Sequence, residues 1–508
     1  MNKSVLRKEK SITSVREMRT SGQLSRHDKT DSVSSWKTAW ALCILWVATT
    51  IASPAQTLTT LTTFDGTNGS DPNASLVQGT DGNFYGTTVT GGNRSCNAPF
   101  GCGTVFTVSQ SGTLTTLHSF CTQANCTDGS VPTAGLVLGT DAALYGGAGA
   151  GGAHGGGTIF RITPQGELKT LYSFCAQAGC ADGAGPSTLI EASNGDFYGT
   201  SGGGAHGFGT VFKITRQGKL TTLYSFCGQS LCADGSDPVG GLVRGTDGNL
   251  YGTTYSGGAF GYGTVFKIVP GGKLTTLHSF DSTDGANPTA SLIQAKSGGF
   301  FGSTSWGGTV LDTCPIGCGT LFRISSTGKL TTLDNFDWSN GYEPHSALVQ
   351  ATDGNLYGTT VDGLGVGTIF NVALGGSNLT ILSAFNGGLD GLYPFGGIVQ
   401  ATHGVFYGTT AGDGSSSNGT VYSLNMGLGS FITFVLPSGK VGQTAEILGQ
   451  GLTGTTSVTF NGVTATSFTV RSDTYMTAVV PIGATTGSVV VTTPTGTLTS
   501  NVIFRITK

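Results

Sequence analysis

The sequence predicts an all-β protein: a seven-bladed β-propeller closed by an N-terminal outer strand, followed by a small immunoglobulin-like sandwich. Three observations lead to this prediction. The 508 residues include 85 glycines and only 10% charged residues, a composition that suits many tight turns between short strands. A Tyr-Gly signature recurs seven times, at intervals of 50 to 60 residues. The strand expected at the outer edge of each repeat is offset by one repeat along the chain, so that one such strand precedes the first repeat and the last repeat lacks one.

Residues 1–55 are predicted to be a signal peptide with a long basic n-region. They hold nine Lys and Arg, four Asp and Glu, and the apolar run Thr38–Ala52. That run is short for a transmembrane helix, and the small residues of Ser53–Ala55 suit a cleavage site directly behind them. An uncleaved anchor is the alternative, and Met18 is a second candidate start.

Cleavage at this point leaves 16 Lys and Arg against 24 Asp and Glu, a net charge of −8. Phosphate-backbone binding depends on clustered basic residues, and the sequence contains no basic stripe, so nucleic acid is a poor partner. We expect a secreted or cell-surface protein with no membrane span in the mature chain. The expected partner is an extracellular glycan or a surface protein.

Ten of the 11 cysteines follow the predicted signal peptide, and they fall into close pairs. Three pairs share one spacing at the same position of the repeat. An even number of cysteines in an exported chain indicates disulfides. Zinc binding is the alternative, but each pair lies in a different repeat and lacks the second pair that a tetrahedral site requires. The predicted disulfides are Cys96–Cys102, Cys121–Cys126, Cys175–Cys180, Cys227–Cys232 and Cys314–Cys318.

Each repeat is predicted to contain four strands. The clearest repeat gives the ranges Gly241–Arg244, Asn249–Thr254, Gly263–Val269 and Lys273–Phe280, separated by turn residues. Four strands in about 50 residues is the size of a propeller blade. The second strand carries the recurring signature, at Tyr85, Tyr145, Tyr198, Tyr251, Phe301, Tyr357 and Tyr407.

The fourth strands are out of step with the rest of the repeat. Seven third strands carry an aromatic residue after a Gly-Thr pair, at Phe106, Phe160, Phe212, Phe266, Phe322, Phe370 and Tyr422. Seven fourth strands start at Leu58, Leu114, Leu168, Leu220, Leu274, Leu330 and Leu379. The first of these precedes the first repeat, and the last repeat lacks one. We therefore predict that Leu58–Phe64 pairs with Gly419–Leu424, which closes the ring and removes two exposed sheet edges.

The motifs DGNxYGTT and GTVFKI, followed by LTTLxSF, resemble the GloVer tandem repeat of choice-of-anchor proteins over residues 57–426. This resemblance implies an exported bacterial protein tethered to the cell surface, and it implies no activity. Residues 430–508 resemble an IPT/TIG domain, an immunoglobulin-like fold, in GQGLTGTTSVTFNG from Gly449, VVPIGATTGSVVVTTPTG from Val479 and SNVIFRI ending at Ile506. The domain boundaries expected are therefore 1–55, 56–428 and 429–508.

The loops of the repeat differ between the two faces of the predicted propeller. The turns between the first and second strands and between the third and fourth are short and uniform, as hairpins are. The other two connections contain every cysteine pair and all the length variation, so we expect a binding site there. Exposed aromatic rings suit sugar stacking, although rings that only fill spaces between blades are the simpler interpretation. The candidates are Trp306, Trp338, Tyr342, Tyr255 and Tyr262, with His154 and His206 in equivalent loops.

No catalytic residue, metal site or cofactor is predicted. The recurring Asp-Gly-x-x-Pro motif, as at Asp234, has two carboxylates nearby in one loop, but turn chemistry explains it more simply than calcium. The G-x-S-x-G match around Ser201 has no strand-to-helix context.

The sequence favours a surface binding or adhesion scaffold. One alternative is a purely structural envelope protein. The other is a carbohydrate-active propeller enzyme, a lyase or glycosidase, in which Glu343, Asp362 and Asp413 would converge near one mouth.

Overall fold

The computed structural model describes residues 56–376 and 378–507, and contacts place them in one compact unit. Within these residues, the regular structure consists of 39 strands and four short 3-10 turns, so the all-β prediction is confirmed. The predicted signal peptide lies outside the described residues. In the part that is described, no helix is long and apolar enough to cross a membrane.

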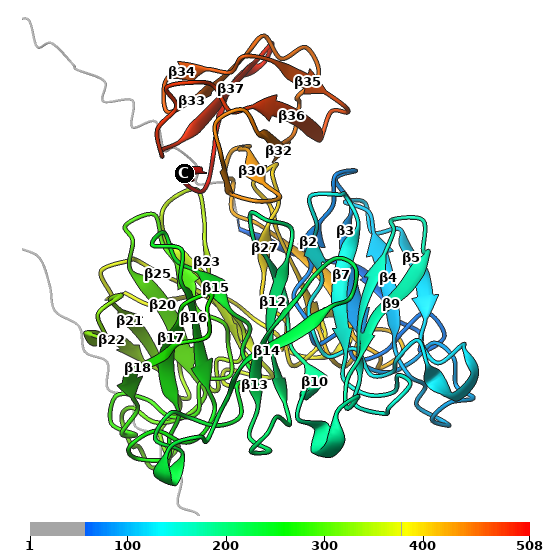
Figure 1. The fold of residues 1–508 in the computed structure, drawn as a ribbon, viewed down its shortest axis with the longest axis vertical. Helices are drawn as coiled ribbons and strands as arrows, with labels where there is room; N and C mark the ends of the chain where they lie inside the picture. Colours follow the sequence, from blue (N-terminus) through cyan, green and yellow to red (C-terminus); the bar gives the residue numbers. More distant parts are fainter. Residues whose placement is uncertain (1–55, 377, 508) are drawn as a thin grey trace, which may run out of the picture. The chain divides into compact units, whose positions relative to one another are not determined.

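Seven antiparallel sheets of one topology follow one another along the repeats. Sheet 1 consists of β2 (Val77–Gln78), β3 (Phe84–Thr88), β4 (Thr104–Val108) and β5 (Leu114–Ser119), which lie side by side in this order in Figure 1. Sheet 2 consists of β6 (Val137–Leu138), β7 (Leu144–Ala148), β8 (Thr158–Ile162) and β9 (Leu168–Ser173). Sheet 3 consists of β11 (Ile190–Glu191), β12 (Phe197–Gly202), β13 (Thr210–Ile214) and β14 (Leu220–Ser225), and β10 (Ala184–Pro186) also pairs with β12.

The remaining sheets repeat this order. Sheet 4 consists of β15 (Val243–Arg244), β16 (Leu250–Thr254), β17 (Thr264–Ile268) and β18 (Leu274–Ser279). Sheet 5 consists of β19 (Ile293–Gln294), β20 (Phe300–Thr304), β21 (Thr320–Ile324) and β22 (Leu330–Asn335). Sheet 6 consists of β23 (Val349–Gln350), β24 (Leu356–Thr360), β25 (Thr368–Val372) and β26 (Thr380–Ala384). The strands lie at the predicted places, but each first strand is shortened to two residues.

Sheet 7 is built from both ends of the repeat region. It consists of β27 (Val399–Gln400), β28 (Phe406–Thr410), β29 (Thr420–Asn425) and β1 (Thr57–Thr63). In the antiparallel register, Leu58 lies opposite Leu424 and Thr62 opposite Val421. The predicted pairing of the N-terminal strand is therefore confirmed.

Seven apolar clusters fill the spaces between consecutive sheets. The cluster between sheets 7 and 1 contains Phe64 and Val421 together with Phe84 and Phe106. Each sheet thus packs on two neighbours, and the contacts form a closed cycle. No sheet leaves a hydrophobic face without a partner.

The Tyr-Gly signature has a packing reason. Gly86 on β3 lies opposite Phe106 on β4, and a Cβ atom added to Gly86 would lie 2.5 Å from Cζ of that ring. The glycine therefore makes room for the aromatic residue of the third strand. The Tyr85 hydroxyl donates a hydrogen bond of 2.8 Å to Asp81 Oδ2, which ties the second strand to the turn before it.

The two threonines that follow the signature have separate roles. Thr87 Oγ1 donates to the carbonyl of Ala134 in the next repeat, at 3.1 Å, and so joins neighbouring sheets. Thr88 Oγ1 lies 2.8 Å from Thr104 Oγ1 and joins the second strand to the third. Both hydroxyls are buried and hydrogen-bonded, which is the condition under which buried polar groups are tolerated.

Tyr422 departs from the phenylalanine that the other six third strands carry. Its side chain is fully buried, and its hydroxyl has no hydrogen-bond partner among the described residues. Burying an unpaired hydroxyl costs free energy, so Tyr422→Phe is expected to raise the free energy of unfolding by about 1–2 kcal/mol. Urea unfolding of the purified protein measures this change. Tyr357→Phe is the control, because it removes a 2.8 Å hydrogen bond to Asp353 and should lower stability. A Tyr422→Phe protein no more stable than the wild type would contradict the prediction.

The C-terminal residues form two four-stranded sheets around their own apolar core. One sheet has the order β30 (Thr433–Phe434), β32 (Thr444–Leu448), β36 (Tyr475–Val479) and β35 (Phe468–Val470). The other has the order β34 (Val463–Thr464), β33 (Ser457–Phe460), β37 (Val489–Thr493) and β38 (Gly496–Thr499). A parallel pair, β31 (Ser438–Gly439) and β39 (Arg505–Ile506), completes this region.

Candidate functional site

The connections between second and third strands meet the connections between fourth and first strands at one end of each sheet. Isolated bridges join them pairwise, as between Ser70 and Thr90, Ser236 and Ser256, and Ala286 and Trp306. We call the surface formed by these loops the loop face. The surface formed by the short hairpin turns is the turn face.

All ten described cysteines lie in loops of the loop face, and they form the five predicted disulfides. Three of the 3-10 turns, Ala124–Cys126, Ala178–Cys180 and Ser230–Cys232, end on the second cysteine of a pair. Short disulfide rings of this kind restrict loops more than they stabilise the whole chain.

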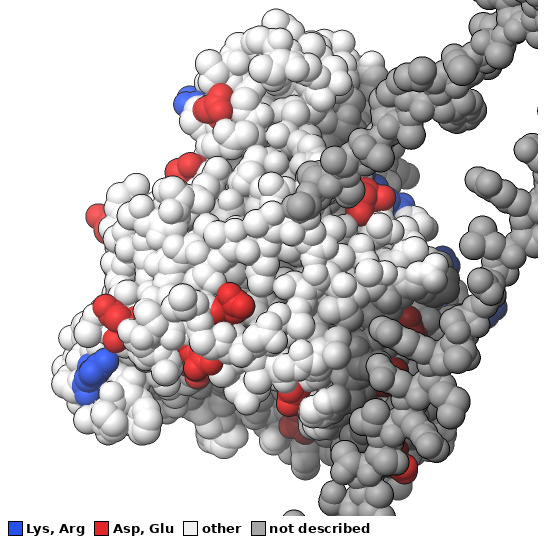
Figure 2. All heavy atoms as spheres, turned by 180° about the vertical axis from the view of Figure 1, so that it is seen from behind, with Lys and Arg blue, Asp and Glu red and all other residues white. Residues whose placement is uncertain are grey.

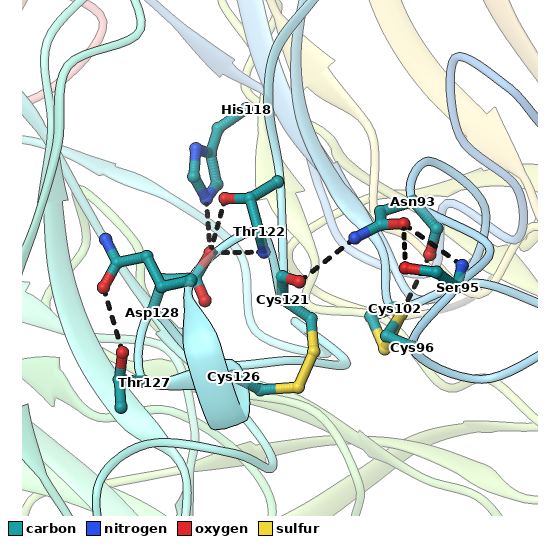
Figure 3. Close-up of a disulfide and its surroundings, with 11 residues drawn as sticks. Asn93, Ser95, Cys96, Cys102, His118, Cys121, Thr122, Cys126, Thr127 and Asp128 are labelled. Atoms are coloured by element: carbon teal, nitrogen blue, oxygen red, sulfur yellow. Dashed lines mark hydrogen bonds and ion pairs between the residues drawn. A yellow bond between two sulfur atoms is a disulfide. The ribbon is translucent and has the colours of Figure 1, made fainter.

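Two disulfides approach each other in the first repeat (Figure 3). Sulfur atoms of Cys96, Cys102 and Cys121 lie within 4.8 Å of one another. Asn93 Nδ2 donates a hydrogen bond of 3.1 Å to the carbonyl of Cys121 and so ties the two loops together. Within the described ranges, this is the only group of three or more potential metal-ligating residues, and all of its sulfurs are in disulfides.

The aspartates of the Asp-Gly-x-x-Pro motif anchor the cysteine loops. Asp182 is fully buried and accepts hydrogen bonds from the Tyr172 hydroxyl, at 2.8 Å, and from the backbone N–H groups of Ala176 and Gln177. In the first repeat, Asp128 Oδ2 contacts His118 Nε2 at 3.0 Å and accepts hydrogen bonds from the N–H and hydroxyl of Thr122 (Figure 3). These are protein donors, in line with the turn chemistry expected of the motif.

Three of the predicted aromatic residues come together on the loop face. The ring of Tyr342 lies 5.3 Å from that of Trp306 and 5.4 Å from that of Trp338, measured between centroids. Trp306 follows β20, while Trp338 and Tyr342 follow β22. Trp338 is 44% exposed, and burial raises the pKa of Tyr342, with the nearby charges of Glu343 and Asp362 adding to the shift. We call these three residues the aromatic cluster.

The other four predicted site residues do not join it. Tyr262, His154 and His206 are exposed in loops of other sheets. Tyr255 is half-buried, and its carbonyl accepts a hydrogen bond of 3.0 Å from Asn287 Nδ2. Among the described residues, no ring contact links any of these four to the aromatic cluster.

Exposed apolar side chains are concentrated on the loop face. Fifteen large hydrophobic residues of the described chain remain exposed, and two of them, Val441 and Ile482, lie in turns of the C-terminal region. The other 13 all lie in loops of the loop face. They are Phe100, Phe208, Leu231, Val239, Phe260, Tyr262, Val310, Leu311, Ile316, Trp338, Leu364, Leu389 and Tyr393. The turn face of the repeats has none, so the two faces differ in the chemistry they offer to a partner.

Each carboxylate considered for an enzymatic site has a hydrogen-bond or ion-pair partner of its own. Glu343 Oε1 contacts His345 Nε2 at 3.1 Å, and Asp362 Oδ1 accepts from its neighbouring Gly363 N–H. Asp413 Oδ2 accepts from the N–H of Gly388, at 2.7 Å. Ser201, in the G-x-S-x-G match, is buried with its hydroxyl 2.7 Å from Thr210 Oγ1, between two strands.

A cavity of about 500 Å³ lies on the turn face, where sequence reasoning placed no site. Its walls come from first strands, such as β15 and β19, and from the C-terminal segments 435–438 and 501–505. Three basic side chains, Arg244, Lys296 and Arg505, line it. Glu191 is its acidic lining residue, and this carboxylate is paired with Arg216.

A repeat pattern in the sequence pointed to this region. Four first strands end in a glutamine whose Oε1 accepts an N–H from the preceding repeat, as Gln350 does from Lys296 at 2.9 Å. One of these bonds, from Thr402 N–H to Gln78, spans the ring closure. The equivalent residues in sheets 2, 3 and 4 are Leu138, Glu191 and Arg244. Glu191 still accepts the equivalent N–H, from Thr140 at 2.9 Å, whereas the side chains of Leu138 and Arg244 have no acceptor atom for it. The replacement of the repeated glutamine by Arg244 is the sequence signal that was missed.

One known protein family matches the chain over its repeats. The Gloeobacter/Verrucomicrobia repeat matches residues 47–181, 177–365 and 314–476, well over half of the sequence. The chain belongs to this family. The resemblance noted from the DGNxYGTT and GTVFKI motifs is thereby confirmed.

The solved structures that resemble this Gloeobacter/Verrucomicrobia repeat protein have low sequence identity and low TM-scores against it. The extracellular domain assigned to a hybrid two-component system of B. thetaiotaomicron is 11% identical, with a TM-score of 0.46, over 72% of this chain and 39% of that one. A protein assigned as a gluconolactonase is 14% identical over 65% of this chain and 95% of its own, with a TM-score of 0.37. A luciferin-regenerating enzyme is 14% identical over 59% and 92%, with a TM-score of 0.38. Among curated proteins, no relative matches this sequence.

Charged side chains are sparse on the face of the repeat protein that Figure 2 shows. In the view of Figure 2, Lys, Arg, Asp and Glu side chains are scattered over the described surface, and no continuous run of basic residues crosses it.

Proposed function

We propose that the protein is an exported binding scaffold whose loop face holds an extracellular glycan. In this proposal, residues 56–428 form a seven-bladed β-propeller, residues 429–508 form an IPT/TIG-type immunoglobulin-like domain, and residues 1–55 direct export. The glycan stacks on the aromatic cluster of Trp306, Trp338 and Tyr342. The C-terminal domain serves as a spacer or docking module.

The seven-bladed architecture is supported by the repeat sheets. Seven four-stranded units of one topology, the pairing of β1 with β29 and the cycle of apolar clusters fit a propeller closed by a strand from the other chain end. The two C-terminal sheets, each of four strands around one core, fit a small sandwich.

An extracytoplasmic location is supported by the cysteines. Five disulfides in one chain suit an oxidising compartment, since cytosolic proteins keep their thiols reduced.

The aromatic cluster is the observation that carries the binding proposal. A pyranose ring has flat apolar patches of C–H groups, and an exposed indole offers a flat surface of matching size. Trp338 is exposed, whereas contacts with Tyr342 restrict its movement, so little side-chain entropy is lost when a sugar binds. Carboxylates of Glu343 and Asp362 lie close enough to influence Tyr342 and are suited to accept hydrogen bonds from sugar hydroxyls.

A glycan array probed with the purified protein tests the proposal. We expect binding to a subset of glycans, and we expect Trp338→Ala to lower the affinity for them about tenfold or more, because one stacked aromatic ring dominates such contacts. Phe100→Ala is the matched control. This residue is 64% exposed on the loop face, in the first sheet, and its loss should leave the affinity unchanged.

Two results would contradict the proposal. One is the absence of glycan binding at millimolar concentration. The other is equal binding by the wild type and by Trp338→Ala. Release of free sugar from a bound glycan would instead indicate the enzymatic alternative.

A further inference from the structure

Residues of the repeats and residues of the C-terminal region both line the cavity on the turn face. Leu242 and Leu292 come from the repeats, and Leu436 and Val502 come from the C-terminal region. The volume of about 500 Å³ lies in the usual range of small-molecule sites. Lys296 and Thr246, which also line it, remain exposed, so the cavity is open to solvent.

Three cations meet there without an anion to pair with them. Arg505 Nη1 donates to the carbonyls of Gly245 and Thr246, at 2.7 and 2.9 Å, and Lys296 Nζ donates to the carbonyl of Ser500, at 3.2 Å. Arg244 Nη1 contacts Ser193 Oγ at 3.4 Å. All of these acceptors are neutral. Within the described ranges, none of the three side chains forms an ion pair.

Two acidic groups near the cations, Glu191 and Asp247, already have partners of their own. Glu191 accepts from Arg216 and from the N–H and hydroxyl of Thr140. The charge of Asp247 partly offsets the desolvation that lowers the pKa of Arg505, without a direct contact between the two side chains. The Oδ2 atom of Asp247 instead contacts Lys267 Nζ, at 3.0 Å. The cavity lining therefore keeps an excess of positive charge.

Partial desolvation makes these three positive charges less favourable in the absence of a ligand. Desolvation lowers the pKa of Arg244, Lys296 and Arg505, and repulsion from Arg505 lowers the pKa of Arg244 further. An anion in the cavity would offset both effects, since opposite charge stabilises a partly desolvated cation. Apolar walls beside such cations favour a ligand whose remaining part is hydrocarbon.

We propose that this cavity binds a small organic anion, a carboxylate with an apolar chain. Its head group accepts hydrogen bonds from Arg244, Arg505 and Lys296, and its chain packs against the leucine and valine side chains of the walls. Because the walls come from both the repeats and the C-terminal region, the bound anion holds the two together. This site lies on the opposite face from the proposed glycan site and is independent of it.

Calorimetric titration with hexanoate, octanoate and decanoate tests the proposal on the protein that contains both the repeats and the C-terminal sheets. We expect saturable one-to-one binding of octanoate, and we expect Arg244→Gln to lower its affinity about tenfold, the usual effect of one charge-assisted hydrogen bond. Arg244→Lys should recover part of the loss. Octanoate should also raise the Tm of the wild type.

Two controls distinguish the contribution of the ligand's charge to binding from the contribution of burying its hydrocarbon chain. Octanol has the same chain without the charge and should bind at least about tenfold more weakly. Lys273→Gln removes a cation of the same repeat, outside the cavity, and should leave octanoate affinity unchanged. Equal binding of octanol and octanoate, an unaltered affinity in a folded Arg244→Gln protein, or no binding of any of the three carboxylates would overturn the proposal.

Discussion

Phe64→Ala is expected to lower the free energy of unfolding by about 3–5 kcal/mol, the usual cost of removing a fully buried phenylalanine ring. Phe64 directly follows β1, has no exposed surface and packs edge-on against Phe106 of sheet 1, with 5.0 Å between ring centroids. It belongs to the cluster that joins sheet 7 to sheet 1. Domains are stable by only about 5–15 kcal/mol, so this change removes a large share of the total.

Deletion of residues 56–64 is the stronger version of this experiment. It removes β1 and leaves β29 as an unpaired edge strand, which is a template for aggregation. We expect the truncated protein to lose cooperative unfolding and to aggregate. Thr59→Ala is the control, because this residue is exposed on the same strand and its loss should change stability by less than about 0.5 kcal/mol. Unchanged unfolding of the truncated protein would mean that the ring does not depend on this closure.

Gly86→Ala is expected to destabilise the protein by about 1–3 kcal/mol through overpacking. The added methyl group would lie 2.5 Å from Phe106 Cζ and 2.9 Å from Leu76 Cδ2, closer than carbon atoms approach without movement. Both neighbours are buried in one cluster, so neither has open space to move into. Urea unfolding monitored by fluorescence measures the loss.

Two further variants identify the cause. Gly271→Ala adds the same methyl group in a turn where no atom lies within 4 Å, and it should leave stability close to that of the wild type. Phe106→Leu in the Gly86→Ala background should cost less than the sum of the two single changes, because the smaller side chain makes room for the methyl group. Additive effects of Gly86→Ala and Phe106→Leu would show that the ring is not the obstacle.

Local periodicity was enough to predict the repeats. The order of Tyr-Gly, Gly-Thr-aromatic and Leu-Thr-Thr segments located the strands to within a few residues, because each segment corresponds to one strand with one packing role. The five disulfides followed from spacing alone, since short loops bring each pair together. Closure by Leu58–Phe64 followed from counting, because one surplus strand at the start matches one missing strand at the end.

Contacts between distant residues could not be predicted in this way. Trp306, Trp338 and Tyr342 form a cluster, whereas Tyr255, Tyr262, His154 and His206 stand in equivalent loops without joining it. Equivalent sequence positions lie on the same face but in different sheets, so the repeat pattern does not say which of them touch. The predicted length of the first strands was too great, because only two residues of each apolar run pair with the second strand.

The sequence by itself determined that this is a closed array of seven repeated β units with oxidised cysteine loops. Those features depend on contacts within one repeat or between neighbours, which a periodic sequence specifies over and over. Only the tertiary structure decided that Arg244, Lys296 and Arg505 line one cavity. Arg505 lies more than 200 residues beyond the other two, and such distant residues meet only when the C-terminal segments pack on the turn face.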